Sequence, residues 1–106
     1  MVASESMYPT LEKGDVIVIS KLGYKIFGIE YKDPIPEDII AFNHKQKLVI
    51  KRIDKIDDSK GIFVLGDNSI NSTDSREFGY ISQDSIVGKA IIRLNLKEFS
   101  ITFLTE

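Results

Sequence analysis

The sequence lacks cysteine altogether, holds a single histidine, and carries nearly balanced charges. Without cysteine the chain can form neither a disulfide framework nor a thiolate nucleophile or metal ligand. Its 14 basic and 16 acidic residues give a net charge of −2. This balance argues against nucleic acid as a partner, because binding a phosphate backbone needs a basic surface. No run approaches the roughly 20 apolar residues of a membrane-spanning helix, and no three-part secretory signal precedes Ser4. We therefore expect this chain to be soluble.

The length and composition predict one compact domain over residues 1–106. A chain of 106 residues with 42% apolar and 28% charged residues has an ordinary globular composition and can bury one modest core. Its apolar residues come in short, strand-like runs separated by Gly, Pro, Asp and Asn. We expect a mainly β fold, a small coiled antiparallel sheet or barrel with little helix. The predicted strands cover residues 15–20, 38–43, 47–57, 61–65, 86–95 and 99–104.

Two segments carry more specific expectations about the fold. Val16 to Ile19 is apolar on both faces, so we expect this strand to be central in the sheet. Residues 22–31, LGYKIFGIEY, combine aromatic and aliphatic side chains with flanking lysines. Such a segment is typical of a membrane interface, although it also fits a hairpin whose aromatic side chains complete the core. Under the first interpretation, the side chains that contact lipid are Tyr24, Ile26, Phe27 and Ile29.

The stretch SESMYPTLEKGD at residues 4–15 places two serines beside a predicted turn. Serine hydroxyls often do no more than cap turns, but a serine held by a tight loop is a nucleophile if another residue removes its proton. The only histidine, His44, lies between two predicted strands among polar neighbours. That context favours an exposed turn over a sheltered general base. A Ser-His-Asp triad is therefore disfavoured.

A lysine in a following strand is the better candidate for the base. In KLVIKRID, residues 47–54, alternation puts Val49, Lys51 and Ile53 on one face. Lysine is almost never buried without a reason, and burial favours the neutral amine that a base needs. The alternative is a lysine at a strand edge whose amine reaches water.

A polar loop follows the strand predicted at 61–65. It reads GDNSINSTDSREFG, residues 66–79, and contains several side chains able to organise a site. Ser72 is able to hydrogen-bond a neutral lysine amine, and Asp74 is able to pair with Arg76 or Arg52. The cluster is equally consistent with a loop whose polar side chains only satisfy backbone groups.

Taken in this order, the three stretches resemble the type I signal peptidases, a family of membrane-bound serine-lysine proteases. SMYPTL at 6–11 is similar to the family's nucleophile motif, KGDVIVI at 13–19 to the strand that follows it, and IKRI at 50–53 to its lysine motif. GDNSINSTDSREFG is similar to the closing motif, and VGKAIIRL at 87–94 to the final strand. The resemblance covers nearly the whole chain, and several motifs in one order are far more specific than one.

The resemblance implies a role for each matching residue. Ser6 would be the nucleophile, and Lys51 its general base and then the general acid toward the leaving amine. The hydroxyl of Ser4 would join the backbone N–H of Ser6 in the oxyanion hole. Ser72 would orient the Lys51 amine, and the site would be braced by Asp74, Arg76 and Arg52. No metal or cofactor is implied, and lysine at the base position resembles the bacterial type.

The family removes amino-terminal signal peptides from exported preproteins, cutting after small residues at −1 and −3. Signal peptides are thus the implied substrate, bound in extended form at a sheet edge. The implied location is the cytoplasmic membrane, with the catalytic domain on the outer face and the membrane surface as a partner. We expect the family's membrane anchor and the large insert of some members to be absent, which leaves a near-minimal catalytic core. Glu5 stands where the family commonly has glycine.

Two other functions fit parts of the sequence. Self-cleaving repressors share serine-lysine chemistry and a strand-rich core, but they need a scissile site in their own chain and usually a DNA-binding domain. A catalytically silent signal-peptidase-like protein would serve as an assembly or chaperone module, as in pilus systems, but is expected to lose Ser6 or Lys51. The discriminating expectation is spatial: Ser6 Oγ and Lys51 Nζ within hydrogen-bond reach, with Ser72 also touching the amine.

Overall fold

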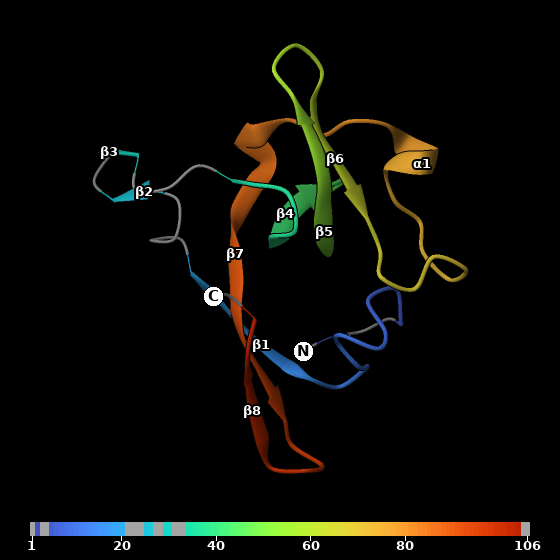
Figure 1. The fold of residues 1–106 in the computed structure, drawn as a ribbon, viewed down its shortest axis with the longest axis vertical. Helices are drawn as coiled ribbons and strands as arrows, with labels where there is room; N and C mark the ends of the chain where they lie inside the picture. Colours follow the sequence, from blue (N-terminus) through green and yellow to red (C-terminus); the bar gives the residue numbers. More distant parts are fainter. Residues whose placement is uncertain (1, 3–4, 21–24, 27–28, 31–33, 105–106) are drawn as a thin grey trace.

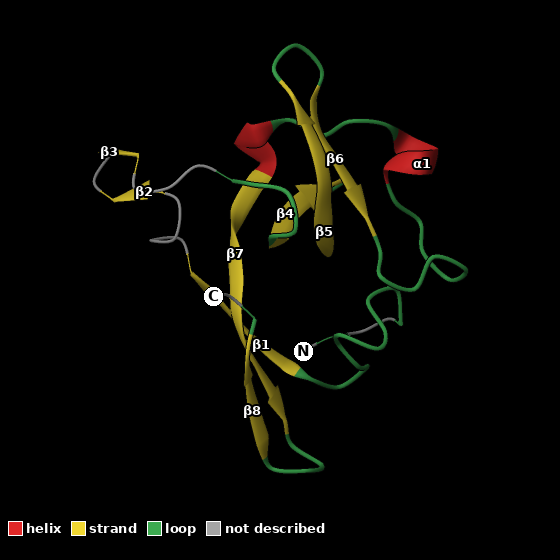
Figure 2. Ribbon diagram, viewed as in Figure 1, coloured by secondary structure: helices red, strands yellow, loops and turns green. Residues whose placement is uncertain are grey.

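The computed structural model describes residues 2, 5–20, 25–26, 29–30 and 34–104, with the backbone alone at 25–26 and 29–30. About half of the described chain is β strand, and helix is confined to two short segments (Figures 1 and 2). None of its helices is long and apolar enough to cross a bilayer. The elements are β1 (Val16–Ser20), β2 (Lys25–Ile26), β3 (Ile29–Glu30), β4 (Ile39–His44), β5 (Lys47–Asp57), β6 (Gly61–Leu65), helix α1 (Ser75–Phe78), the 3-10 helix η1 (Gln83–Ser85), β7 (Ile86–Asn95) and β8 (Ser100–Phe103).

The main sheet is antiparallel and open. Its strands follow the order β1-β7-β4-β5-β6, and β8 also pairs with β7. The long strands bend where the register shifts, between Ile53 and Lys55 in β5 and opposite Ala41 and Phe42 in β7. Such irregularities let a sheet coil. The predicted mainly β, antiparallel class is confirmed. Among the described strands, β1, β6 and β8 each pair with one neighbour only, so the sheet stays open instead of closing into a barrel.

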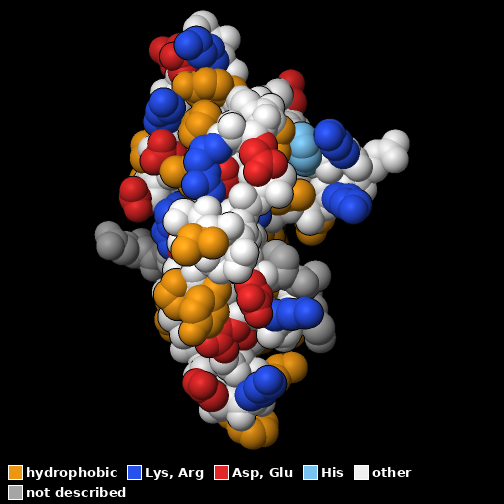
Figure 3. Space-filling view, turned by 90° about the vertical axis from the view of Figure 1, so that its right-hand side faces the viewer, with side chains coloured by type: hydrophobic (Ala, Val, Ile, Leu, Met, Phe, Trp, Pro, Cys, Tyr) orange, Lys and Arg blue, Asp and Glu red, His pale blue; other side chains and the backbone are white. Residues whose placement is uncertain are grey.

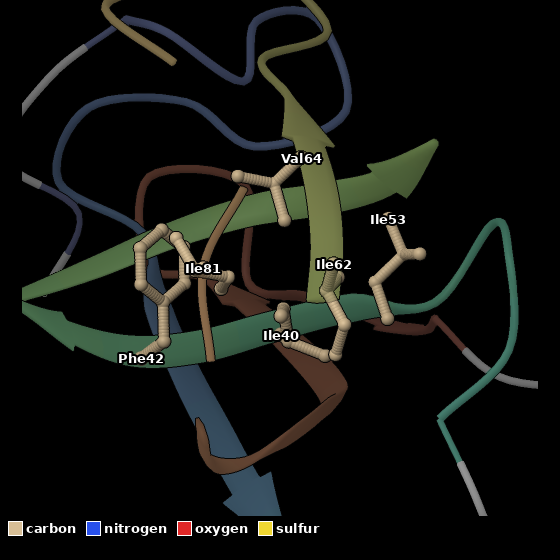
Figure 4. Packing of buried hydrophobic residues seen from close by; sticks show 6 residues of the cluster. All are labelled: Ile40, Phe42, Ile53, Ile62, Val64 and Ile81. Atoms are coloured by element: carbon tan, nitrogen blue, oxygen red, sulfur yellow. The ribbon is translucent and has the colours of Figure 1, made fainter. Parts of the chain in front are cut away.

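The central strand is β4, which lies between β7 and β5. Its residues 39–42 are all buried, so both of its faces are covered. On one face Ile40 and Phe42 join a cluster with Ile53, Ile62, Val64 and Ile81 (Figure 4). On the other face Ile39 packs with Met7, Leu11 and Ala90. These two clusters hold β5 and the loop before β1 in place.

The expectation that Val16 to Ile19 would be central is wrong. Strand β1 ends the sheet and pairs only with β7 among the described strands. Val18 is 39% exposed, whereas Ile17 packs against the second cluster. An apolar run on both faces is typical of a buried strand, but here one of those faces is part of an apolar surface that remains open.

That surface is built by register across three strands. Val16 pairs with Leu94, which pairs with Ile101, and Val18 pairs in the same way with Ile92 and then Phe103. Directly paired residues point to the same face of a sheet. We call this the β1–β7–β8 apolar face; Ile101 and Phe103 on it are 64% and 72% exposed. At the turn between β7 and β8, Leu96 and Phe99 are also exposed.

Residues 22–31, interpreted from the sequence as a membrane-interface segment or a hairpin, contain two short paired strands. β2 pairs antiparallel with β3, with Lys25 opposite Glu30. This pairing fits the hairpin interpretation at the level of the backbone. The side chains of Tyr24, Ile26, Phe27 and Ile29, expected at a membrane or in the core, lie outside the residues whose side chains the structure describes.

Candidate active site

The candidate nucleophile lies in a loop that the core anchors at two points. Met7 and Leu11 are buried in the second cluster, on either side of the predicted turn. Two backbone hydrogen bonds of 3.0 Å, from Tyr8 N to the carbonyl of Glu5 and from Leu11 N to that of Met7, tighten the loop. Ser6 is thereby held at 7% exposure, while Glu5 beside it is exposed.

The candidate base meets Ser6 directly. Lys51 is only 5% exposed, and its Nζ donates a hydrogen bond of 2.7 Å to Ser6 Oγ. The alternative of an amine that reaches water is therefore wrong. Burial lowers the pKa of Lys51, because desolvation disfavours the ammonium form, and the negative charge of Asp74 partly opposes this shift. The site thus favours proton loss from a lysine that touches a serine hydroxyl.

Asp74 organises the polar loop behind the pair. Its fully buried carboxylate accepts hydrogen bonds from Gly66 N, Ser72 Oγ and the Arg76 guanidinium, each of 2.9 Å, and it caps helix α1. Burial opposes charging this group, but the hydrogen bonds from Arg76, Gly66 and Ser72 outweigh it and hold the pKa of Asp74 well below its usual range. Of the two partners expected for Asp74, the structure therefore selects Arg76. Ser72 donates to Asp74, and its expected role toward Lys51 stays a prediction.

Arg52 pairs with a residue that sequence reasoning missed. Its Nε and Nη2 donate to the two carboxylate oxygens of Asp67, at 2.9 and 2.8 Å. Thr10 Oγ1 donates to the same carboxylate, and Asp67 N contacts Met7 Sδ at 3.4 Å. A planar guanidinium suits such a two-point contact with a carboxylate. In the sequence, Gly66-Asp67-Asn68 is typical of a turn. A turn is a local feature, so it does not predict that the Asp67 side chain connects Arg52 of β5 to Thr10 in the Ser6 loop.

Two neighbours of Asp67 also hold the nucleophile loop. Asn68 N donates to the carbonyl oxygen of Ser6 at 2.8 Å, and Asn68 Nδ2 donates to that of Glu5 at 3.1 Å. At Gly66 a Cβ would lie 2.1 Å from Ser72 Oγ and 2.6 Å from Ser6 O. Only glycine lets these backbones approach so closely. Turn chemistry alone does not reveal this use of Gly66 and Asn68.

An open groove of about 570 Å³ runs past the pair. It follows a free edge of β5, because β6 pairs with β5 only from Arg52 to Asp57 and leaves 47–51 unpaired on that side among the described strands. Side chains from both faces of this edge therefore reach the groove. Its lining residues are Val2, Ser6, Met7, Leu11, His44, Lys47, Leu48, Val49, Ile50, Lys51, Asn71, Thr73 and Phe78.

The position of His44 differs from the prediction. An exposed turn was expected, but His44 is the last residue of β4, is half-buried, and lines the groove. Its ring lies 4.2 Å from that of Phe78, measured between centroids.

The two serines expected in the site have different outcomes. The hydroxyl of Ser6 accepts a hydrogen bond from Lys51. Ser4, expected in the oxyanion hole, lies outside the described residues.

A mainly β fold in which a serine hydroxyl meets a buried lysine amine beside an open groove has the layout of a serine peptidase. The comparison with known families agrees: the chain matches the family described as signal peptidase, peptidase S26, over residues 1–56 and 58–95. The chain belongs to this family.

Individual relatives match over most of their length. Signal peptidase I of Bacillus caldolyticus is 31% identical over 150 residues, covering 97% of this chain and 82% of the relative. Signal peptidase IB of Staphylococcus aureus is 29% identical, covering 99% and 82%. Probable signal peptidase I-1 of Synechocystis is 26% identical, covering 87% and 68%. Because the first alignment spans 150 positions and this chain has 106 residues, the Bacillus relative carries segments with no counterpart here.

Proposed function

We propose that this chain is an endopeptidase that removes amino-terminal signal peptides from exported preproteins, with Ser6 as nucleophile and Lys51 as general base. The observation that carries the proposal is the buried hydrogen bond of 2.7 Å between Lys51 Nζ and Ser6 Oγ. Membership of the signal peptidase family supports the reaction class, and the names of the relatives support the substrate.

In the first half of the reaction, the neutral Lys51 amine takes the proton of the Ser6 hydroxyl as Oγ attacks the scissile carbonyl. Burial prepares this step, because it lowers the pKa of Lys51. The resulting ammonium then gives its proton to the leaving amine, and an acyl-enzyme remains on Ser6. The backbone N–H of Ser6 and the hydroxyl of Ser4 are the proposed donors to the oxyanion.

In the second half, Lys51 removes a proton from a water molecule that attacks the ester. The tetrahedral intermediate collapses, Ser6 recovers its proton from Lys51, and the acyl product leaves. Ser72 and Arg76 hydrogen-bond the carboxylate of Asp74. The negative charge of this carboxylate raises the pKa of Lys51 and so offsets part of the lowering caused by burial. Ser72 is the proposed positioning residue for the amine.

The substrate binds as an extended strand along the free edge of β5 at residues 47–51. Because side chains alternate along a strand, the residues at −1 and −3 point to the same side. Apolar residues line the groove around Ser6, among them Met7, Leu11 and Ile50. We propose that these shallow apolar walls are the reason for small residues at both substrate positions.

The proposed place of action is the outer face of the cytoplasmic membrane. The β1–β7–β8 apolar face and the exposed turn beyond it support contact with lipid, since contiguous exposed apolar surface marks an interaction site. Figure 3 shows hydrophobic side chains at the end of the molecule where Figure 1 places the β7–β8 hairpin. The contact expected from Tyr24, Ile26, Phe27 and Ile29 remains part of the same proposal.

The test is cleavage of a peptide with an Ala-x-Ala signal junction, in the presence of lipid or detergent. We expect the parent to cut after the second alanine and Ser6→Ala and Lys51→Met to be inactive. Methionine keeps the volume of the lysine stem and removes the amine. Lys55→Met is the matched control, since it changes an exposed lysine on the same strand outside the groove.

Folding of each variant is checked by circular dichroism, so that loss of activity is not loss of structure. Cleavage that survives Lys51→Met would reject lysine as the base. No cleavage by the folded parent with any Ala-x-Ala peptide would favour the catalytically silent assembly module. Cleavage within the chain itself, dependent on Ser6, would favour the self-cleaving alternative.

A further inference from the structure

The groove beside Ser6 is lined by a positively charged side chain, Lys47, to which the proposed mechanism gives no role. The chain as a whole has a net charge of −2, yet no acidic side chain appears among the described residues that line the groove. Lys47 and Lys51 line it, together with His44. The proposed mechanism uses Lys51 and leaves Lys47 without a role.

The register places Lys47 in line with Lys51. Side chains at even spacing share one face of a strand, so Lys47, Val49 and Lys51 project from the same face of β5. Lys47 is paired directly with His44 across the hairpin. The turn between them has only Lys45 and Gln46, both with positive φ of 50° and 66°, the tight form that fits a hairpin. A tight two-residue turn therefore fixes the positions of Lys47 and His44, both of which line the groove.

Lys47 is available to a ligand. It is exposed, and among the described residues it takes part in no ion pair. His44 beside it is held by its contact with the ring of Phe78. Figure 3 shows Lys or Arg side chains next to the histidine, at a projecting lobe of the molecule. An exposed cation at the wall of a peptide groove attracts a carboxylate.

We propose that Lys47 is a specificity-determining residue that favours an acidic side chain about four residues from the scissile bond of the bound peptide. This inference rests on the proposed function, since it assumes that the groove holds an extended substrate. A strand added along residues 47–51 has one residue beside Lys51 and, four positions further on, a residue beside Lys47 on the same face. The spacing is about 13 Å, from the rise of about 3.3 Å for each residue of a strand.

Peptides with one glutamate test the proposal. The glutamate is moved singly through a neutral Ala-x-Ala peptide on both sides of the junction, because the added strand is free to run in either direction. We expect kcat/KM to be about two- to fivefold higher than for the glutamine peptide at one position about four residues from the scissile bond. Lysine at that position lowers it by a similar factor, and added salt weakens the preference.

Variants assign the preference to Lys47. Lys47→Gln is expected to abolish it, and Lys47→Glu to reverse it in favour of the lysine peptide. Lys55→Gln removes the same charge from the same strand outside the groove, and is expected to leave the preference unchanged. The proposal is overturned if Lys47→Gln and the parent show the same profile, or if Lys55→Gln loses the preference equally.

Binding separates this inference from the proposed function. The labelled peptides are titrated against Ser6→Ala by fluorescence anisotropy, which needs no catalysis. A glutamate preference in binding without cleavage by the parent would support the role of Lys47 and reject the peptidase. The opposite outcome is cleavage that depends on Ser6 while neither kcat/KM nor binding changes with the position of the glutamate. That outcome would support the peptidase and reject the role of Lys47.

Discussion

Lys51 Nζ and Ser6 Oγ lie 2.7 Å apart, although 45 positions separate the two residues in the chain. Pairing of β5 with β4 brings the lysine to this point, and the burial of Met7 and Leu11 brings the serine. The loop after β6 then joins the two parts, since Asn68 N donates to the Ser6 carbonyl and Arg52 of β5 pairs with Asp67. The pair therefore depends on contacts that lie behind it.

The pH dependence of cleavage should follow the charge on Lys51. Only its neutral form accepts the Ser6 proton, and burial puts its pKa below the ordinary value of 10.5. The rate is expected to rise with pH through this lowered pKa, because protonated Lys51 predominates below it. Measurement of kcat/KM from about pH 6 to about pH 10 checks this. A rate that falls over this range would contradict the proposed base.

The charge of Asp74 should set where that rise occurs. Asp74 raises the pKa of Lys51, so its neutralisation in Asp74→Asn is expected to move the rise in kcat/KM to lower pH. The variant also loses charge-assisted hydrogen bonds and is expected to be less stable, so kcat/KM is calculated from the concentration of folded protein at each pH. A shift to higher pH would show that Asp74 acts on Lys51 by another route.

Stability in acid should depend on Asp74. Its pKa is held well below the usual range in the folded protein, so its contribution to the free energy of unfolding is fully present above about pH 4. That contribution is lost as pH falls further. Urea unfolding at about pH 7 and about pH 3 should show this loss in the parent and a smaller loss in Asp74→Asn. At about pH 7 the variant is expected to be less stable by about 2 kcal/mol, because a buried carboxylate loses its partners.

Gly66→Ala should damage the site through steric contact alone. The new Cβ would lie 2.6 Å from the backbone oxygen of Ser6, which cannot move without shifting the nucleophile. We expect the free energy of unfolding to fall by about 1–3 kcal/mol and kcat/KM to fall more than tenfold.

Gly79→Ala is the control for that experiment. Gly79 has a φ of 81°, and a methyl group added at its Cα would meet nothing within 4 Å. Its ψ of −167° completes a backbone conformation that is nearly restricted to glycine, so the cost of the substitution is expected to be backbone strain of about 1–3 kcal/mol, with cleavage retained. Gly66 does not have a positive φ, so this strain does not arise there. Equal loss of cleavage in the two variants would show that the effect of Gly66→Ala is not specific to its contact with Ser6.

The exposed apolar residues of the β7–β8 hairpin should contribute to lipid binding. Phe99 is 92% exposed at the turn, and Phe99→Ser is expected to weaken binding to phospholipid vesicles by roughly 10- to 100-fold, since burying a phenylalanine contributes about 1.5–3 kcal/mol. Sedimentation with vesicles measures this. Ile70→Ser is the control, because Ile70 is 90% exposed but lies in the polar loop. Equal weakening by both substitutions would reject the hairpin as the contact.

Sequence patterns predicted the strands well, because short apolar runs bounded by turn residues are a local property. The ranges expected at 47–57, 61–65 and 86–95 match β5, β6 and β7 to the residue. The prediction failed for the place of β1 in the sheet. Pattern shows which side chains are apolar, whereas the neighbours that cover them come from strand pairing, and in this sheet β4 has a neighbour on both sides.

The sequence by itself determined the mainly β class, the bounds of β5, β6 and β7, and the family resemblance, since each depends on residue types at short spacing. Only the tertiary structure decided which of two arginines pairs with Asp74, that Asp67 holds Arg52, and that His44 lines the groove. The contact between Ser6 and Lys51 also belongs to this second group. These relationships join distant parts of the chain, because the packing of two core clusters and the pairing of β5 with β4 and β6 bring those parts together.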